Sequence, residues 1–520
     1  MSAVYGIDLG TTNSAVATLT ESGRIEVLPN EMGRDTTPSA VFFGAAGVVV
    51  GAEALERAPG EPDSAVLLVK RLMGTQTPVH VAGQVHTPES ISAIILRQLV
   101  SAAGDDPSPE VVITVPAYFG TAEREATFQA GTIAGVTVLE LLDEPVAAIM
   151  PRVLAGGTAR ILVYDLGGGT FDSTVITLVD GALTVVATDG HHRLGGADVD
   201  VRLLNLVLSR VEDSVPEDAY EGLADDGNAL AVLRREVEAA KKALSSRVAV
   251  DLRVRTAAGV TTVTVTREDL RFACLDLFET TMDIVRTVLD KAKAAGVQSI
   301  DEIVLVGGSS RITVLAELLE SSLGIRPRLV DPDLAVAKGA ALRAHLIRST
   351  PQFMKWSDQA ADPVTLVQSL RTSVTAVAPR AIGILVDDSH DPEGRRSFVD
   401  HLITAGMPLP VRATKTFATI LDRQNAVRIR VYEQAGATAS ENVDHNRLVL
   451  DGEVSGFGNS PDGTAVDVTL EIAVDGRMTL TALDRVAGRE LRLEAFVEGV
   501  VDSAESDDLA RSVAGLIVRG

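Results

Sequence analysis

Two segments of the chain combine glycine, threonine and aspartate in an order that suits phosphate chemistry. The first covers residues 6–14 (GIDLGTTNS) and the second covers residues 164–172 (YDLGGGTFD). Each follows an apolar run and precedes further β-prone sequence, which is typical of a strand, a tight turn and a second strand. Glycines allow a backbone to approach a phosphate closely and to present its N–H groups. An ordinary hairpin turn is the alternative, but it would not require a second copy of the pattern.

The side chains in these two turns supply the other groups that a bound phosphate needs. Threonine hydroxyls can donate hydrogen bonds, and aspartates can hold a metal ion or the water around it. The turn residues are Asp8, Gly10, Thr11, Thr12 and Asn13 in the first segment, and Asp165, Gly167, Gly168, Gly169, Thr170 and Asp172 in the second. Two such hairpins facing each other could hold a nucleoside triphosphate from both sides. The pattern therefore predicts an ATP-binding protein with an internal duplication.

Composition and charge argue against several other kinds of function. The 520 residues include 47 Lys and Arg against 71 Asp and Glu, a formal net charge of −24. That charge disfavours binding to nucleic acid and to anionic membranes, which attract basic patches. The single cysteine, Cys274, excludes an intramolecular disulfide and a cysteine metal cluster. The start of the chain has no signal-peptide pattern and no apolar run reaches membrane-spanning length, so we expect a cytoplasmic protein.

The elements that must position the two turns are those of an α/β domain over residues 1–348. We expect strands over residues 111–115, 160–164 and 302–306, and helices over residues 121–134 and 230–244. A helical pattern also covers residues 267–295, and it is too long for one helix without a break.

The remaining part of the chain changes character twice. Residues 349–375 contain prolines, the only tryptophan and polar stretches, and we expect a linker between domains there. Residues 376–500 alternate in the β pattern between turn signals, which predicts a β-sandwich. The final segment, residues 501–520, forms a tail in which apolar residues over 507–518 recur at helical spacing and predict one short helix.

Several further segments extend the pattern of the two turns to one family. They are residues 112–119 (VITVPAYF), 143–148 (DEPVAA), 194–198 (LGGAD), 238–246 (EAAKKALSS), 306–311 (VGGSSR) and 331–337 (DPDLAVA). In this order, they make the chain resemble the seventy-kilodalton heat-shock chaperones, the DnaK-like proteins, over most of its length. The resemblance implies an α/β actin-like, two-lobed ATPase domain followed by an all-β sandwich that binds peptide.

The resemblance also implies a set of catalytic residues, namely Lys70, Glu144, Asp165, Thr170 and Asp172. Lys70 stands in the segment VKRLMG, and a lysine there would neutralise charge on the transferring phosphoryl group and hold the attacking water. Glu144 would face the metal and its water shell. Hydrolysis of ATP needs in-line positioning of water and stabilisation of charge, and these residues would supply both.

A second set of residues would hold the nucleoside and the metal. Glu238, Lys241, Lys242 and Ser245 are spaced i, i+3, i+4 and i+7, so they share one face of a helix. A plain surface Glu–Lys pair is the alternative for this spacing. By resemblance the face grips adenine and ribose, and the other residues around ATP or ADP are Gly195, Gly196, Gly307, Gly308, Ser309, Arg311 and Asp333. Mg²⁺ would be held by Asp8, Asp165 and Asp172, mostly through water, and K⁺ is a second candidate cation.

The chain departs from the family where its two domains communicate. Pro116 and Arg124 match positions that relay the nucleotide state, but residues 373–379 (SVTAVAP) lack the leucines and the acidic residue of the family linker. Glu140 replaces the arginine of typical bacterial members, and Phe128 replaces a usual lysine. The first change reverses a charge on the surface that engages J-domain partners and the linker. Because the sandwich pattern ends near residue 500, we also expect no helical lid, and hence fast release of clients.

The interpretation that fits these observations is a slow DnaK-like ATPase, converting ATP and water to ADP and phosphate. By resemblance it would bind unfolded or extended polypeptide, and its partners would include a J-domain protein and a nucleotide exchange factor. An ATP-gated scaffold with one dedicated protein partner remains open, because the linker, Glu140 and the missing lid favour it. The adenosine-face helix and the β domain disfavour a sugar or acetate kinase, and the β domain also disfavours a filament-forming actin relative.

Overall fold

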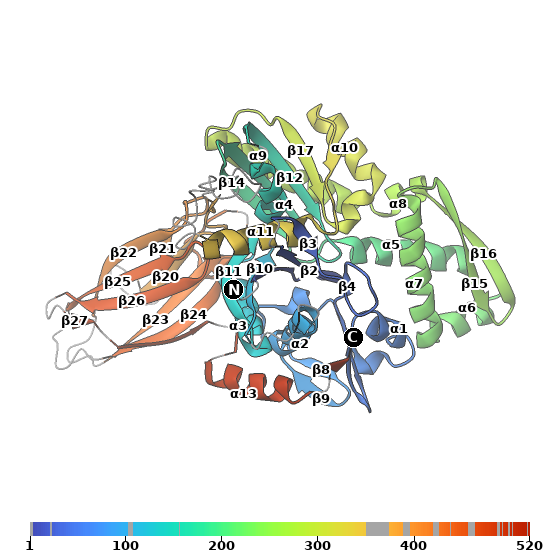
Figure 1. Cartoon of the computed structure of the whole chain (residues 1–520), viewed down its shortest axis with the longest axis horizontal. Coiled ribbons are helices and arrows are strands. Elements are labelled where there is room, and N and C mark those ends of the chain that lie inside the picture. The colour runs from blue at the N-terminus through green and yellow to red at the C-terminus, as the bar shows by residue number, and fades with distance from the viewer. Residues whose placement is uncertain are drawn as a thin grey trace.

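The structure is a computed structural model. It describes residues 4–519 except 21–22, 102–103, 105–107, 155, 350–373, 388–395, 420–425, 437, 456–462, 486–488, 491, 498–499, 502 and 517. The linker expected over residues 349–375 therefore lies almost entirely outside the described residues. Figure 1 shows a two-lobed α/β body with a β-sandwich beside it.

Two sheets of the same topology form the centre of the α/β body. In spatial order the first sheet contains β11 (Thr137–Asp143), β10 (Glu110–Val115), β1 (Val4–Asp8), β2 (Asn13–Leu19) and β3 (Ile25–Val27), with β4 (Thr37–Pro38) paired to β2. The second sheet contains β18 (Arg328–Leu329), β17 (Glu302–Val306), β12 (Thr158–Leu166), β13 (Phe171–Val179), β14 (Ala182–His191) and β19 (Val374–Thr375). In each sheet an antiparallel hairpin is followed by parallel strands on the side of its first strand. The predicted internal duplication is therefore visible in the strand order.

Helices cover both faces of these sheets. On the first lobe, α2 (Pro88–Ser101) and α3 (Thr121–Ala134) pack over a core that includes Ile7, Val16 and Ile113. Between the lobes, α4 (Glu144–Val153) and α11 (Ala335–Ser349) share one core with strands of both sheets. They cross closely, since a Cβ at Gly339 would lie 1.7 Å from the carbonyl oxygen of Ala147. The two lobes are thus packed around one helix pair.

Each lobe also carries an extension. On the first lobe these elements are β5 (Ala40–Gly44), β6 (Gly47–Val50), α1 (Ala52–Arg57), β7 (Ala65–Leu67), η2 (Val69–Leu72), β8 (Val79–Val81) and β9 (Gln84–His86). On the second lobe they are α5 (Gly196–Glu212), α6 (Glu217–Ala224), α7 (Gly227–Leu244), β15 (Ala249–Thr256), β16 (Gly259–Thr266) and α8 (Arg267–Ala273). Helices α9 (Leu275–Ala294) and α10 (Thr313–Leu323) pack instead on the central sheet of the second lobe. The break expected within residues 267–295 is confirmed, because Cys274 has non-helical dihedral angles between α8 and α9.

The sandwich consists of two antiparallel sheets around an aliphatic core. One sheet contains β21 (Ser397–Ile403), β20 (Ile382–Asp387), β23 (Ala426–Gln434), β24 (Asn446–Ser455) and β28 (Arg492–Val497). The other contains β22 (Val411–Ala418), β25 (Ala465–Ile472), β26 (Met478–Asp484) and β27 (Arg489–Glu490). Residues such as Val431, Val449 and Leu470 are fully buried between the sheets. The α/β fold followed by an all-β sandwich agrees with the fold class that the sequence predicts.

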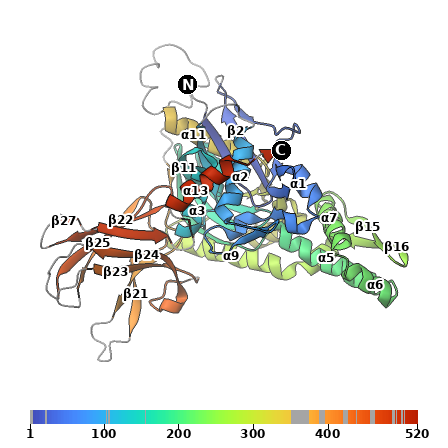
Figure 2. The same ribbon diagram turned by 90° about the horizontal axis from the view of Figure 1, so that it is seen from below.

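The C-terminal segment contains one helix and one short strand. Helix α13 spans Ser503–Ala514, and β29 spans Val518–Arg519. The prediction of a helix over residues 507–518 is therefore wrong in its boundaries. The helix begins four residues earlier, and Val518 belongs to a strand because it pairs with β6 of the first lobe, a partner that local spacing cannot reveal. Figures 1 and 2 both show α13 lying beside α2 and α3.

Candidate functional site

The turns of the two predicted phosphate hairpins face each other where the two lobes meet. A Cβ on Gly168 would lie 2.2 Å from Thr12 Oγ1, and a Cβ on Gly169 would lie 2.3 Å from Thr11 Cγ2. Both glycines are therefore required by sterics, since any side chain would collide with the opposite turn. The structure thus brings the two segments singled out by the sequence into direct contact from opposite lobes.

Lys70 and Glu144 form a buried ion pair beside these turns. Lys70 comes from the short helix η2 and Glu144 from the first turn of α4, and Lys70 Nζ lies 2.5 Å from Glu144 Oε1. Lys70 is only 5% exposed, and its ammonium also lies 5.7 Å from the centre of the Phe119 ring. A desolvated lysine of this kind carries a strong local field. It is placed to act on charge that develops between the hairpins.

Asp165 and Asp172 of the second hairpin are buried, and Asp8 of the first hairpin is partly buried close to them. Burial, with the nearby Glu144 carboxylate, raises the pKa of Asp8 to about 7 and raises the pKa of Asp165 and Asp172 well above the usual range. Asp172 Oδ1 is buried and has no hydrogen-bond partner among the described residues. Lys70 is the cation that lowers the pKa of all three carboxyls, so their combined negative charge is only partly offset. A divalent cation would favour their ionised forms.

The arrangement suits a hydrated cation better than a direct metal cage. In the part of the chain that the structure describes, no three His, Cys, Asp or Glu side chains are arranged to ligate one metal ion. Mg²⁺ usually retains several waters and contacts one or two carboxylates plus substrate phosphates. The three aspartates fit that mode of binding.

The loop of residues 306–311 and the start of α5 pack against the second hairpin. Gly307 has φ 79°, and a Cβ there would lie 2.3 Å from Asp165 Oδ1. Ser310 Oγ accepts a hydrogen bond of 3.1 Å from the backbone N–H of Leu166. A Cβ on Gly195 would lie 2.6 Å from the backbone nitrogen of Gly169. These contacts hold the tip of the hairpin in place, and they bring predicted residues from three separate segments together.

The predicted adenosine face divides into two environments. Lys241 is buried, and its ammonium donates to the carbonyl oxygen of Gly196 at 2.9 Å and to Asp200 at 2.6 Å. Lys242 remains largely exposed and pairs with Glu238 at 2.7 Å, the pair expected for a surface helix. Ser245 caps the C-terminus of α7. Lys241 therefore anchors this face of α7 to α5, whereas the side chains of Glu238 and Lys242 remain accessible to solvent.

The other predicted nucleoside residues, Arg311 and Asp333, form an ion pair with each other. Both side chains remain partly exposed, at 43% and 48%. A Cβ on Gly308 would lie 3.4 Å from Asp333 Oδ1, so this pair adjoins the glycine loop. The pair is accessible to a ligand that approaches the loop from solvent.

Arg71 is a site residue that sequence reasoning did not identify. Its Nε donates to the carbonyl oxygen of Gly169 at 2.9 Å, and its Nη2 contacts Asp198 Oδ2 at 2.5 Å. The side chain therefore runs from the first lobe to two elements of the second. The only sequence signal was its position next to Lys70, because Asp198 lies 127 residues away. Arg71 is placed to respond to relative movement of the lobes.

The charge reversal at Glu140 has a partner within the chain. Arg343 of α11 donates to both carboxylate oxygens of Glu140, to Oε1 at 3.1 Å and to Oε2 at 2.8 Å, and the glutamate side chain is only 12% exposed. We expected Glu140 to present a reversed charge on this surface. The structure corrects that expectation, because the Glu140 carboxylate is largely buried and is paired with Arg343. Phe128, the other departure from the family, lies 3.9 Å beneath the guanidinium of Arg477 in the sandwich. A cation–π contact thus crosses between the domains at that position.

The sandwich contacts the first lobe through buried ionic groups. Glu433 is 1% exposed, and its carboxylate accepts a hydrogen bond of 3.0 Å from the backbone N–H of Thr121 at the start of α3. Glu123 of α3 and Arg447 of the sandwich form a two-fold hydrogen-bonded pair at 2.8 Å and 2.9 Å. Arg124, a predicted relay residue, donates to the carbonyl oxygen of Asp475 at 3.1 Å. The sequence did not reveal Glu433 or Arg447, because no local motif surrounds them.

His192 of the second lobe joins this interface. Its Nε2 lies 3.0 Å from Arg380 Nη2, and its ring packs on Tyr118 with centroids 4.8 Å apart. Burial and the adjacent Arg380 lower the pKa of His192 from 6.5 to about 4. The other groups that influence it are Glu123, Arg447 and His191.

We expect the interface at His192 to weaken in mild acid. The docked state holds His192 neutral, so its contribution to stability is complete above about pH 6.5 and is lost as the pH falls through about 4. A His192→Asn variant should lose less stability than the parent over that window. Thermal unfolding of both proteins between pH 4 and pH 7 measures the difference. Superimposable pH profiles would show that His192 does not contribute.

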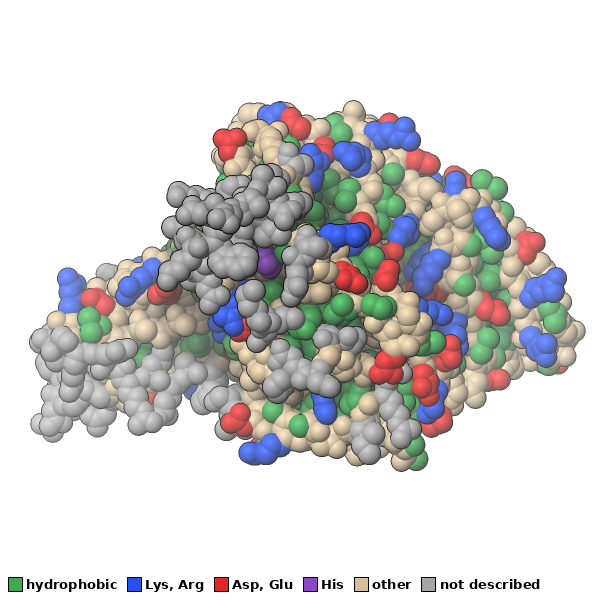
Figure 3. Space-filling view, in the orientation of Figure 1, with side chains coloured by type: hydrophobic (Ala, Val, Ile, Leu, Met, Phe, Trp, Pro, Cys, Tyr) green, Lys and Arg blue, Asp and Glu red, His purple; other side chains and the backbone are tan. Residues whose placement is uncertain are grey.

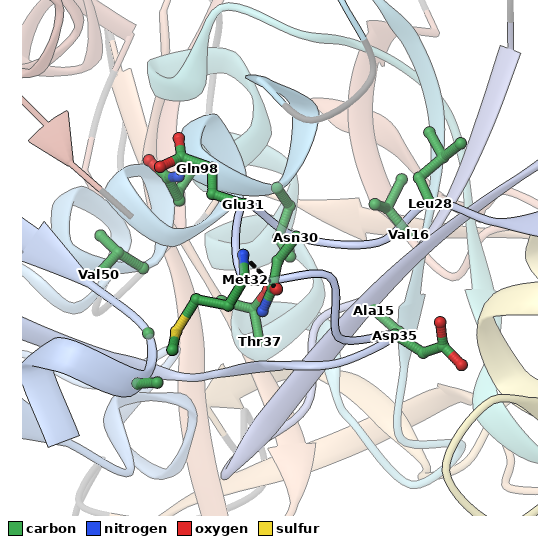
Figure 4. Close-up of a pocket in the computed structure, with 13 residues that line it drawn as sticks. Ala15, Val16, Leu28, Asn30, Glu31, Met32, Asp35, Thr37, Val50 and Gln98 are labelled. Atoms are coloured by element: carbon green, nitrogen blue, oxygen red, sulfur yellow. Dashed lines mark hydrogen bonds between the residues drawn. The ribbon is translucent and has the colours of Figure 1, made fainter. Parts of the chain in front are cut away.

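A separate hollow on the first lobe involves none of the predicted nucleotide residues. It is lined by Leu28, Asn30, Met32, Val50 and Gln98, among others (Figure 4). Asn30 Oδ1 accepts a 3.0 Å hydrogen bond from the Met32 backbone and shapes the loop at its mouth. Its lining offers no cluster of catalytic groups. On the face drawn in Figure 3, acidic and basic side chains are interspersed over the two-lobed body.

The topology and the opposed hairpin turns together define an actin-like, two-lobed fold of the ATPase type, followed by an all-β sandwich. Residues 4–514 match the model of the family described as Hsp70 protein. The chain belongs to the Hsp70 family. Members of this family are ATPases that bind ATP or ADP with Mg²⁺.

Individual relatives support the same assignment. The chain is 35% identical to the chaperone protein DnaK of Thermotoga neapolitana over 502 residues, which cover 94% of this chain and 79% of the relative. The DnaK protein of Thermotoga maritima matches with the same identity and the same shares. The DnaK protein of Thermosipho africanus is 34% identical over 501 residues, again with 94% and 79% covered. No helix among the described residues is long and apolar enough to cross a membrane.

Proposed function

We propose that this protein hydrolyses ATP in the cleft between its lobes and uses the cycle to act as an Hsp70-type chaperone. The observation that carries the proposal is the direct opposition of the two hairpin turns, with the buried Lys70–Glu144 pair beside them. Such a cleft can surround a triphosphate from both lobes. We divide the chain into the nucleotide-binding domain (residues 1–348), the linker (349–375), the sandwich (376–500) and the C-terminal tail (501–520).

In this proposal the chain's own residues act mainly by positioning and by charge. The backbone N–H groups and threonine hydroxyls of residues 10–13 and 167–170 hold the phosphates. Lys70 stabilises negative charge on the γ-phosphoryl group and, with Glu144, orients the attacking water. Asp8, Asp165 and Asp172 would hold Mg²⁺, mostly through water, and the bound ion would supply positive charge that offsets the charge of the phosphates. K⁺ as a second cation is part of the same proposal.

We further propose that the sandwich binds extended polypeptide through backbone hydrogen bonds and a side-chain pocket. The family assignment supports this, as do the names of the DnaK relatives. In the described residues after β28, α13 packs against α2 and α3, which supports a sandwich that exchanges its clients quickly. A J-domain protein and a nucleotide exchange factor are proposed partners, although the Glu140–Arg343 pair alters one expected contact surface.

Steady-state hydrolysis of ATP tests the proposal. Turnover by the full chain should require Mg²⁺ and should rise when an unfolded polypeptide is added. Removal of Mg²⁺ by EDTA should abolish turnover, since the buried aspartates then hold no cation to neutralise the phosphates. Absence of ATP binding by calorimetry would overturn the proposal. If no added polypeptide changed the turnover rate, the protein would be an ATPase whose hydrolysis is not coupled to polypeptide binding.

A nucleotide-gated scaffold is the second candidate, and the buried ionic contacts of the sandwich with the first lobe favour it. A sandwich held in one position could present a fixed surface to one dedicated partner. The two functions differ in the refolding of a denatured reporter enzyme at substoichiometric protein. A chaperone should restore activity over several cycles of ATP, whereas a scaffold should not.

A further inference from the structure

The segment that follows the sandwich returns to the first lobe and becomes part of its hydrophobic core. Val513 of α13 is 3% exposed and Val501 is 9% exposed, and both belong to the core cluster that contains Ile7 and Ile113. Leu509, Leu516 and Val518 pack against the same cluster. The segment is therefore anchored by apolar burial over about twenty residues, and not at a single point.

Hydrogen bonds reinforce this anchor in the C-terminal half of the segment. Strand β29 pairs in parallel with β6, with Val518 opposite Val48 and Arg519 opposite Val49. The pairing covers the edge of a small sheet that would otherwise end at β6. Arg97 of α2 donates to the carbonyl oxygen of Val513 near the end of α13. An arginine that satisfies a terminal carbonyl stabilises a helix end.

The sandwich is therefore tied to the α/β body at both of its chain ends. On its N-terminal side, β19 extends the sheet of the second lobe by pairing Val374 with Leu183 of β14. On its C-terminal side, β28 is followed by the segment that enters the core of the first lobe. The docking contacts of Glu433 with Thr121 and of Arg447 with Glu123 lie between these two anchors. Separation of the sandwich would require release of one anchor as well as loss of the ionic contacts.

We propose that the described residues between 500 and 519 form an intramolecular clasp, whose binding site is the surface made by α2, α3 and the edge of β6. The clasp keeps the sandwich docked on the first lobe whether or not the cleft holds a nucleotide. It goes beyond the proposed ATPase and chaperone activities, and it does not depend on them. Because the docked contacts and the clasp form together, loss of the clasp should expose α3 even when every domain stays folded.

Amide hydrogen exchange tests the clasp, because the Thr121 N–H group donates directly across the interface to Glu433. The probe is the exchange rate of the segment that contains Thr121, measured in nucleotide-free full-length protein. Val513→Asp places a charge in the core that anchors α13, and Ser512→Asp places the same charge on the neighbouring exposed position. We expect Val513→Asp to speed exchange at the start of α3 by at least ~10-fold. Ser512→Asp should match the parent.

Further measurements separate undocking from unfolding. Protection in the β12–β13 hairpin and in the β23–β24 pair should be the same in all variants if the second lobe and the sandwich stay folded. Arg97→Ala removes only the bond to Val513, and it should accelerate exchange at Thr121 in the same direction by a smaller factor. Addition of ADP with Mg²⁺ should leave the parent protected. Equal exchange in the parent and Val513→Asp, or rapid exchange in the nucleotide-free parent, would overturn the clasp.

Discussion

Replacing Lys70 with alanine is expected to reduce ATP turnover by at least ~100-fold while leaving ATP binding within a few-fold of the parent. The lysine is 5% exposed and lies 2.5 Å from Glu144, so its charge is delivered at short range and with little screening by water. Stabilisation of charge that develops during transfer affects the rate more than the affinity. Steady-state hydrolysis and calorimetric titration of ATP measure the two effects separately.

Two comparisons make this result specific. Lys70→Met keeps the aliphatic packing but removes the charge, so it should lose as much turnover as the alanine variant. Lys293→Ala removes an exposed lysine of α9, whose side chain is 55% exposed, and it should retain full activity. Parent-like turnover by Lys70→Met would show that the buried ammonium plays no catalytic part. Thermal unfolding of each variant establishes that the loss of the partner of Glu144 has not unfolded the cleft.

The Asp172→Asn variant is expected to be more stable than the parent in the absence of metal, and at the same time to lose at least ~100-fold in Mg²⁺-dependent turnover. Burial and the neighbouring Glu144 raise the pKa of Asp172 well above its usual range, and its Oδ1 has no partner among the described residues. For a carboxyl whose pKa is raised in the folded state, stability is present at low pH and is lost as the pH rises through the folded-state pKa. The asparagine amide does not ionise, so the variant does not lose this stability as the pH rises. The amide also cannot offer a negatively charged oxygen to the water shell of Mg²⁺.

Thermal unfolding in EDTA at pH 5 and pH 8 measures the first effect, and hydrolysis with Mg²⁺ measures the second. The gain in melting temperature should be larger at pH 8 than at pH 5. Asp290→Asn, at an exposed position of α9 with its side chain 73% exposed, is the matched control and should change neither quantity. A variant that is less stable than the parent at both pH values would contradict the electrostatic argument. Undiminished turnover would remove Asp172 from the proposed site.

The variants at Lys70 and Asp172 and the variants of the clasp affect different parts of the protein. Lys70 and Asp172 act at the cleft, whereas Val513 lies in the core under α13, on the opposite side of the first-lobe sheet from the α4–α11 pair. Changes at the cleft should leave exchange at Thr121 unchanged in the nucleotide-free protein. Changes at Val513 should leave the nucleotide-free cleft intact. Measurements can therefore contradict the roles proposed for Lys70 and Asp172 without contradicting the clasp, and the reverse is also true.

Much of the cleft could be predicted from local sequence, because the phosphate hairpins depend on local requirements. A turn that presents N–H groups needs glycine, and the repeat of the same residue types in residues 6–14 and 164–172 predicted the duplication that the strand order shows. The helix at residues 121–134 and the break near Cys274 were also local features, set by apolar periodicity and by length. The alternation within residues 376–500 predicted the strands of a sandwich, and β23 is one of those that the structure contains.

Other parts were decided only by tertiary structure, because their partners are distant in the chain. Arg71 reaches Asp198 across 127 residues, and Glu433 reaches Thr121 across 312 residues, so neither contact leaves a pattern in local sequence. The boundaries of the terminal helix were wrong because Val518 pairs with Val48, an interaction that overrides the helical spacing of its apolar neighbours. Residue type and spacing thus determined the two phosphate hairpins and the classes of the domains. Packing between distant segments determined how the lobes, the sandwich and the C-terminal segment contact one another, because burial and pairing depend on the partner that the complete fold supplies.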